Sequence, residues 1–400
     1  MKVVYRIHIY IFIALLAIFE SGCGGCRSHK GKLDGSLPVD SLFTDLGKDA
    51  LERRTAMAER TFDALYRNQE LNGVVLYAEG GKILIEKALG WRDLVHRKDS
   101  LQVDDQFQLA SVSKMFTAEA IMVLYSQGKL DYDDEVKKYI PEFPYEGITI
   151  RHLLNHRSGL SRYETLADDH WPDRGIPISN DEVIQLYGKH QPVPYYQPDY
   201  TFHYTNINYA LLASVVERVT GQPFDVFMKE EVFKPLGMEH SYIYTLKGQE
   251  RLKTYMDTKV QGHDLYRSGP QRVQDDYLNG VMGDKMMYST VEDLYKFSVA
   301  LENGTFLPDS IQQEAFTPGS PEWKNGDNYG FGWRLSESHP GTVFHFGWWK
   351  GYRSFFIRDL ERGRTLILLT NTDNGAIGEA LWDFISDTTV QLPAASVLIK

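Results

Sequence analysis

A serine and a lysine, Ser111 and Lys114, lie three residues apart in "LASVSKMFTAEA", at the apparent start of an amphipathic helix. Positions i and i+3 of a helix share a face, so the lysine amine can reach the serine hydroxyl. A hydroxyl becomes an effective nucleophile when a base removes its proton, and lysine can be that base when its surroundings lower its pKa from about 10.4. Taken alone, this spacing is more often an ordinary helix start than a catalytic pair.

Two further groups have residue types that suit the same chemistry. Tyr204 and Asn206 alternate in "FHYTNINYALL", just before a helical pattern, so both side chains can face one side. A tyrosine beside a cationic lysine can share its proton, and an asparagine offers a donor and an acceptor to a substrate amide. In "FHFGWWKG", His345 and Gly347 share one face of a strand-like segment, where the glycine permits close approach of another backbone. Each group taken alone is more often structural.

In the order Ser-x-x-Lys, Tyr-x-Asn, His-x-Gly, the three groups resemble the serine β-lactamase and penicillin-recognising enzyme family. The branch is the one that contains class C β-lactamases, D-alanyl-D-alanine carboxypeptidases, D-aminopeptidases and related esterases. Five further segments, between about residues 73 and 371, resemble the family in the same order: "GKLDYDDEVKKYIPEFP", "ITIRHLLNHRSGLSRY", "KPLGMEHS", "YSTVEDLYKF" and "YGFGWRL". The resemblance therefore covers most of the chain.

The resemblance implies a role for each motif residue. Ser111 would be the acylated nucleophile, Lys114 its base, and Tyr204 the proton shuttle to the leaving group. Asn206 would orient the substrate. No cofactor is implied.

The third motif is expected to bind substrate. The backbone N–H groups of Ser111 and of Trp348, which follows Gly347, would form the oxyanion hole. His345 occupies the place of the family's cation, and its reference pKa of about 6.5 makes its charge conditional. We expect it to bind a substrate carboxylate or to polarise the tyrosine.

Departures from the family pattern bear on the substrate. Thr205 stands where serine is commoner, and "QPDYTFHY" lacks the Pro-Gly that usually precedes the tyrosine loop. Phe346, Trp348 and Trp349 surround Gly347 with aromatic rings where β-lactamases usually carry small residues. We interpret this bulk as narrowing the substrate groove, which favours peptidase or esterase activity over efficient β-lactam hydrolysis.

Other catalytic signatures are missing from the sequence. It has no G-x-S-x-G elbow, H-E-x-x-H pair, phosphate-binding loop or dinucleotide fingerprint. His152 and His156 could be taken for metal ligands, but the resemblance implies that their segment is a structural landmark, so no metal is expected. From Arg27 onward the chain has no cysteine, which excludes disulfides, thiolate nucleophiles and cysteine zinc sites there.

The secondary structure that must position these groups is expected to change along the chain, from a helix and a hairpin to helices and loops and then to strands. A helix is expected near 51–69, followed by a hairpin in "GVVLYAEGGKILIEKALGW". Helices and loops dominate from 111 to about 300, ending in a helix over 291–302 with Ser289 or Thr290 as its N-cap. The strand-like segments "TVFHFGWW", "YRSFFIRDL" and "RTLILLTNT" follow, and then a helix over about 377–386.

Strands at both ends of the chain and helices between them predict an α+β fold. We expect an antiparallel sheet built from the two termini, with a mainly helical subdomain inserted at about 110–300. The resemblance implies the β-lactamase/transpeptidase fold, in a hydrolase domain over 51–390.

The N-terminus carries the features of an export signal. Lys2 and Arg6 precede an apolar run over about 9–19, which is shorter than the roughly 20 residues of a membrane span. Ser21-Gly22-Cys23 resembles the lipobox of bacterial lipoproteins, in which the cysteine is lipidated, although Glu20 departs from the usual apolar residue. The expected signal with its lipobox covers residues 1–23, and a plain cleaved signal with two incidental cysteines is the alternative.

We therefore expect a bacterial periplasmic or outer-membrane-associated lipoprotein. The Gly-rich and polar residues 24–50 would tether the hydrolase domain to a lipid on Cys23, its only membrane contact. The formal net charge of −11 argues against a nucleic-acid partner, because no cation cluster is present.

The predicted function is that of an exported serine hydrolase that forms an acyl-enzyme on Ser111. Its substrate would be an amide or ester, such as a D-amino-acid peptide of the cell wall or a small ester. Two alternatives stay open: a β-lactamase, and a non-catalytic penicillin-recognising or sensory lipoprotein on the same fold.

Overall fold

The structure is a computed structural model that describes residues 46–245, 260–324 and 326–389. The expected signal, the lipobox with Cys23 and most of the expected tether lie outside the described residues. Within those ranges, no helix is both long and apolar enough to cross a bilayer.

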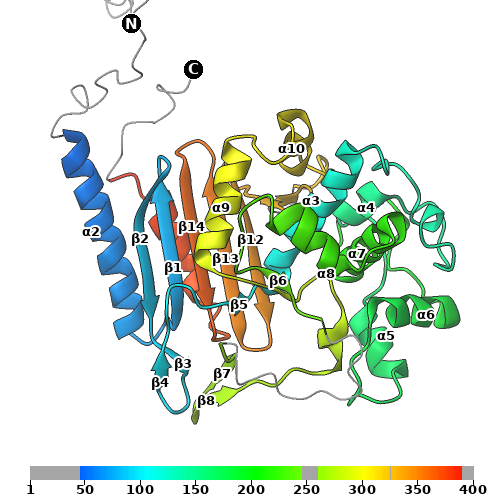
Figure 1. Cartoon of the computed structure of the whole chain (residues 1–400), viewed down its shortest axis with the longest axis horizontal. Helices are drawn as coiled ribbons and strands as arrows, with labels where there is room; N and C mark the ends of the chain where they lie inside the picture. Colours follow the sequence, from blue (N-terminus) through cyan, green and yellow to red (C-terminus); the bar gives the residue numbers. More distant parts are fainter. Residues whose placement is uncertain (1–45, 246–259, 325, 390–400) are drawn as a thin grey trace, which may run out of the picture. The chain divides into compact units, whose positions relative to one another are not determined.

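A seven-stranded sheet joins the two ends of the chain (Figure 1). Its strand order is β10-β11-β12-β13-β14-β1-β2, and all neighbours are antiparallel. Pairing of β1 with β14 connects the N-terminal hairpin to the C-terminal strands, which confirms the α+β prediction of one sheet made from both termini. The strands are β1 (Gly73–Glu79), β2 (Lys82–Leu89), β10 (Asn328–Tyr329), β11 (Arg334–Leu335), β12 (Thr342–Trp349), β13 (Tyr352–Asp359) and β14 (Arg364–Thr370).

Alternate side chains of β1 enter two different cores, because successive residues of a strand face opposite sides of the sheet. Val75 and Tyr77 pack in a smaller core under α2 (Leu46–Arg67) and α11 (Ile377–Ser386). Val74 and Leu76 belong to the larger core on the other face. There α9 (Val291–Glu302) lies against β14 and β1, with Thr290 as its N-cap.

The helical region lies between β5 (Phe107–Gln108) and β9 (Met287–Ser289), on the β12 side of the sheet in Figure 1. Its central helix, α3 (Ser113–Ser126), is buried at every position from Ser113 to Leu124. This differs from the expected amphipathic helix, because a helix buried all round has no solvent face. The other helices after α2 are α4 (Ile150–Leu154), α5 (Tyr163–His170), α6 (Asn180–His190), α7 (Ile207–Thr220), α8 (Phe224–Phe227) and α10 (Asp309–Ala315).

Short strands fasten this region to the sheet domain. β5 and β6 (Tyr242–Ile243) both pair with β9, which places the segment before Ser111 beside the segment that follows Asp284. Two small hairpins complete the described strands, β3 (Trp91–Asp93) with β4 (Lys98–Ser100) and β7 (His263–Tyr266) with β8 (Gly269–Arg272).

A buried ion cluster joins α2 to the sheet. Glu79 of β1 accepts from Arg54 of α2 at 3.2 Å and from Arg364 of β14 at 3.1 Å, and all three side chains are at most 4% exposed. The Tyr77 hydroxyl donates to the same carboxylate at 2.5 Å. Removing one member of such a cluster leaves uncompensated charge in a low-dielectric site.

We expect Glu79→Ala to lower the free energy of unfolding by about 3–5 kcal/mol, because the buried Arg364 loses its carboxylate and the buried Arg54 keeps only Asp387, at 3.3 Å. Thermal melts of the wild type and the variant measure the loss. The matched control is Asp63→Ala, which breaks the ion pair with Lys87, in which both side chains are 37% exposed. That change should cost less than about 1 kcal/mol. Equal losses in the two variants would contradict the assigned role of the cluster.

Candidate active site

The serine-lysine pair lies where α3 begins. Ser111 is part of the 3-10 turn Ala110–Val112, and Lys114 occupies the first turn of α3. Lys114 Nζ is 2.9 Å from Ser111 Oγ, and the lysine side chain is fully buried. Ala110 has a φ of 47°, a left-handed conformation that is uncommon for a residue with a Cβ. Contacts with the surrounding residues must therefore keep the turn in this conformation.

Gly347 allows this turn to lie directly against the sheet. A Cβ built on Gly347 would stand 2.2 Å from the carbonyl oxygen of Leu109 and 3.1 Å from the Cβ of Ala110. Ser354 of β13, the register partner of Gly347, donates its hydroxyl to the same Leu109 carbonyl at 2.5 Å. The glycine of the His-x-Gly motif thus determines how closely Ser111 approaches β12.

Lys114 contacts two further oxygen atoms from distant segments. Its Nζ lies 2.8 Å from Asn206 Oδ1 and 2.8 Å from the backbone carbonyl of Asp284. Three segments that are remote in the sequence therefore converge on one amine.

The orientation of the Asn206 amide follows from its two partners. Its Nδ2 donates to Glu164 Oε1 at 2.6 Å, while its Oδ1 accepts from Lys114. A carboxylate only accepts, so the NH2 group of the amide must face Glu164 and its carbonyl oxygen must face Lys114. The Asn206 oxygen already has a partner, so Asn206 cannot offer a free acceptor to a substrate amide as expected. One hydrogen of its NH2 group remains to donate to a substrate.

Tyr204 lies between two cations. Its ring centroid is 5.0 Å from Lys114 Nζ and 5.2 Å from Arg334 Cζ. Cations at such distances from an aromatic ring are attracted by its quadrupole.

His156 packs against the segment that carries Tyr204 and Thr205. Its ring centroid lies 4.2 Å from that of Tyr204, and its Nδ1 accepts from the backbone N–H of Thr205 at 3.3 Å. Burial and the nearby charge of Lys114 hold its pKa well below 6.5. In the part of the chain that the structure describes, no three His, Cys, Asp or Glu side chains are grouped as metal ligands.

His345 is a neutral, buried residue. It is 1% exposed, its Nδ1 lies 2.9 Å from the carbonyl oxygen of Phe346, and its Nε2 lies 3.0 Å from the Tyr329 hydroxyl. Since a carbonyl only accepts, Nδ1 carries the proton and Nε2 accepts from the tyrosine. Burial, together with Arg334 and Lys114, holds the pKa of His345 well below 6.5. The lowered pKa disfavours the charged form that binding of a substrate carboxylate would need, and both expected roles of His345, carboxylate binding and polarisation of Tyr204, stay predictions.

Arg334 is a cation of the site that the sequence reasoning did not single out. It lies on β11 opposite Phe344 of β12, beside Tyr204. Among residues 46–245, 260–324 and 326–389, no carboxylate forms an ion pair with it. In the sequence, Arg334 belongs to the family-like segment "YGFGWRL", and pairing of β11 with β12 brings it to the site.

The aromatic residues around Gly347 do not all share its face of β12. Phe346 packs against Phe355 and Trp382 in the smaller core, with ring centroids 4.9 Å and 6.0 Å away. Trp348 is 62% exposed, and its ring stacks on the Arg353 guanidinium. The interpretation that all three rings narrow the groove is wrong for Phe346 and Trp348, because only Trp349 shares the face of Gly347.

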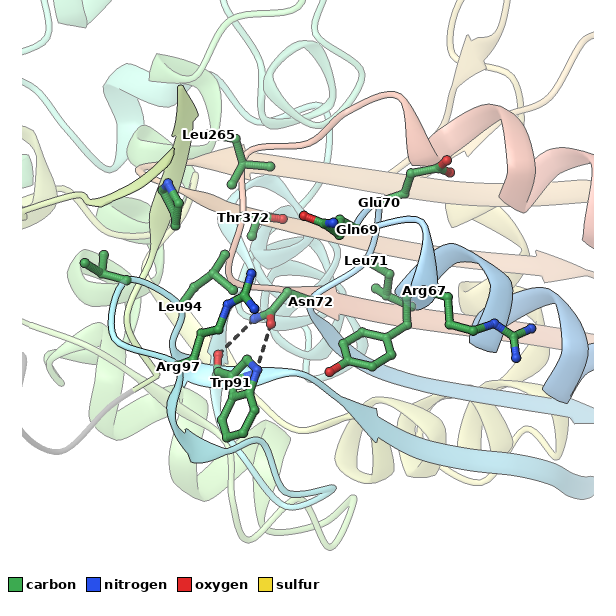
Figure 2. A pocket seen from close by; sticks show the side chains of 13 residues that line it. Arg67, Gln69, Glu70, Leu71, Asn72, Trp91, Leu94, Arg97, Leu265 and Thr372 are labelled. Atoms are coloured by element: carbon green, nitrogen blue, oxygen red, sulfur yellow. Dashed lines mark hydrogen bonds between the residues drawn. The ribbon is translucent and has the colours of Figure 1, made fainter. Parts of the chain in front are cut away.

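A cavity of about 480 Å³ lies apart from these residues (Figure 2). In it, the side chain of Asn72 bonds the backbone N–H and carbonyl of Trp91, both at 2.9 Å. None of the expected site residues lines it. Its lining is Tyr66, Arg67, Gln69, Glu70, Leu71, Asn72, Trp91, Leu94, Val95, Arg97, Leu265, Pro270 and Thr372.

Comparison with known proteins assigns the family. The family model described as Beta-lactamase matches residues 56–389. The chain belongs to the Beta-lactamase family. Penicillin-binding protein 4* of Bacillus subtilis is 34% identical to this member over 324 residues, which are 78% of this chain and 70% of the relative. The putative penicillin-binding protein PbpX of the same organism is 27% identical over 349 residues, 83% of this chain and 81% of the relative.

Solved structures agree with this assignment. The penicillin-binding protein from Bacillus halodurans has a TM-score of 0.68 at 25% identity, covering 81% of this chain and 97% of that one. The D-amino acid amidase from Ochrobactrum anthropi has a TM-score of 0.66 at 23% identity, covering 86% and 98%, and shows the fold alone. This Beta-lactamase family member is a serine hydrolase with the β-lactamase/transpeptidase fold, as predicted.

The lowered pKa of His345 predicts how the variant His345→Gln responds to pH. Below about pH 6.5 the unfolded chain protonates this histidine and the folded chain does not, so the folded state loses stability as the pH falls. The effect reaches at most about 1.4 kcal/mol per pH unit. His345→Gln should therefore lose less stability than the wild type between pH 7 and pH 5.

Denaturant melts at each pH measure this difference. The comparison of wild type and variant is needed because burial raises the pKa of Glu119 to about 7, and that group titrates with the opposite sign. Parallel pH profiles for the two proteins would show that His345 is protonated in the folded state.

Proposed function

We propose that the protein forms an acyl-enzyme on Ser111 and hydrolyses an amide or ester of the D-amino-acid peptide type. The observation that carries the proposal is the 2.9 Å contact between Ser111 Oγ and a fully buried Lys114 amine. A neutral amine has two hydrogens and a lone pair. Asn206 Oδ1 and the Asp284 carbonyl would accept the hydrogens, which directs the lone pair to the serine hydroxyl.

The proposed reaction then follows a simple course of proton transfers. Ser111 Oγ attacks the substrate carbonyl as its proton passes to Lys114, and the backbone N–H groups of Ser111 and Trp348 stabilise the oxyanion. Tyr204 delivers a proton to the leaving nitrogen or oxygen as its bond to carbon breaks, and Lys114 passes the proton that it took from Ser111 on to Tyr204. Water hydrolyses the ester on Ser111 and restores the serine.

The leaving group is proposed to carry a carboxylate. Arg334 supports this, since its guanidinium lies 5.2 Å from the ring of Tyr204 and has no acidic partner among the described residues. A guanidinium binds a carboxylate through two parallel hydrogen bonds. A peptide or amino acid released with a free C-terminus would present such a group.

Export and attachment to a membrane are a separate part of the proposal. Support comes from the sequence alone, in which basic residues, an apolar run and Ser21-Gly22-Cys23 stand in the order of a lipoprotein signal. We propose that Cys23 is lipidated and that the hydrolase acts outside the cytoplasm.

Substituting the nucleophile tests the core of this proposal. Ser111→Ala should abolish labelling by fluorescent penicillin and by a fluorophosphonate, and should lower ester hydrolysis at least about 1,000-fold. Ser126→Ala, at the far end of the same helix, is the matched control and should react as the wild type does. If no acylating probe labels the wild type, the proposal fails and the non-catalytic binding protein is favoured. Turnover of nitrocefin at rates typical of resistance enzymes would favour the β-lactamase.

Substituting Arg334 tests the nature of the leaving group. Arg334→Gln should raise KM for the dipeptide D-Ala-D-Ala about 10- to 100-fold, because a charge-assisted bidentate pair is lost. The kcat/KM for an uncharged nitrophenyl acetate should change less than about threefold, since its leaving group has no carboxylate. Steady-state kinetics on both substrates, with Arg334→Lys as the intermediate case, give the answer. A similar loss on both substrates would contradict carboxylate recognition.

A further inference from the structure

The end of β12 carries a tryptophan that is fixed on several sides. Trp349 lies two residues after Gly347 on the same face, and its Nε1 donates to Asn279 Oδ1 at 3.0 Å. Its ring centroid is 4.9 Å from the Lys285 amine and 5.3 Å from that of Lys350. One hydrogen bond and two cation–π contacts leave this ring little freedom to turn aside for a ligand.

Lys285 joins this ring to the helical side of the site. It is 3% exposed, and its Nζ lies 2.5 Å from the hydroxyl of Tyr163, at the start of α5, as well as 4.9 Å from the Trp349 ring. Asp284 Oδ2 accepts from Lys285 at 3.1 Å and from the Tyr163 hydroxyl at 2.9 Å. Lys285 therefore bridges α5 and β12, through the buried Tyr163 on one side and the half-buried Trp349 on the other.

The position of Tyr204 shows which part of a substrate this bridge would meet. Tyr204, the proposed donor to the leaving group, lies beside His345 and Arg334, over the N-terminal half of β12. With the leaving group at Tyr204, the acyl group would lie on the opposite side of the reacting carbonyl, toward the Trp349 end of β12. Trp349 directly follows Trp348, the proposed oxyanion donor, so it lies only about 3.4 Å further along the strand.

We propose that Trp349, held in place by Lys285, closes the acyl end of the groove and limits the acyl group to one amino-acid residue or a chain of similar length. The inference rests on the proposed function and names its substrate class. A substrate with a short acyl group and a longer leaving group that ends in a carboxylate is a peptide that loses its N-terminal residue. It differs from the removal of a C-terminal residue from a long peptide, in which the acyl group is long.

The test uses the full-length protein and p-nitrophenyl acetate, butyrate and octanoate, which share one leaving group and differ only in acyl length. The wild type should show kcat/KM at least about tenfold lower for octanoate than for acetate, because the long chain meets the Trp349 ring. Trp349→Ala should raise the octanoate-to-acetate ratio about tenfold or more. Trp349→Phe keeps a ring and should stay near the wild type, and Tyr266→Ala, an exposed aromatic residue elsewhere, is the matched control.

Two results would overturn the inference. One is a wild type that hydrolyses octanoate within threefold of acetate, a measurement that needs no variant. The other is a folded Trp349→Ala protein with an unchanged ratio. In both cases hydrolysis that still requires Ser111 would leave the proposed function standing, whereas the absence of Ser111-dependent hydrolysis and labelling would refute that function itself.

Discussion

The arrangement of the site depends on one buried amine with three oxygen partners. Lys114 meets the Ser111 hydroxyl, the Asn206 amide and the Asp284 carbonyl, which come from three separate segments of the helical region. A buried amine needs such partners, because a polar group removed from water is stable only when its hydrogen bonds are replaced. The burial of α3 in the core therefore requires the hydrogen bonds of its lysine. A shift of any of the three segments would move one of these oxygen atoms away from Lys114 and change the contact between Lys114 and Ser111.

Much of this arrangement could be predicted from the sequence. The glycine pair after β1, the alternation in β12 to β14 and the N-cap at Thr290 are local signals, and the elements they indicated are present with nearly the expected bounds. Grouping of Ser111, Lys114 and Asn206 came from a resemblance in motif order, because spacing within one segment carries no information about contacts across the chain.

The parts that were missed depend on tertiary contacts. Arg334 reaches the site only through pairing of β11 with β12, and Glu164 only through its bond to the Asn206 amide. The charge of His345 is determined by burial, which no local pattern reveals. Strand alternation places Phe346 and Trp348 on the face opposite Gly347, so the direction of these two side chains can be predicted from the sequence.

The joining of β1 to β14 has a consequence for the way the molecule is made. Gly73 pairs with Thr370, so the sheet that presents Gly347 to the Ser111 turn cannot close until β14 has left the ribosome. Contacts between such distant residues form late and slowly, because a long loop must be ordered first. A nascent chain that has not yet reached β14 would therefore have the serine and the lysine, but the sheet beside them would still be open between β1 and β13.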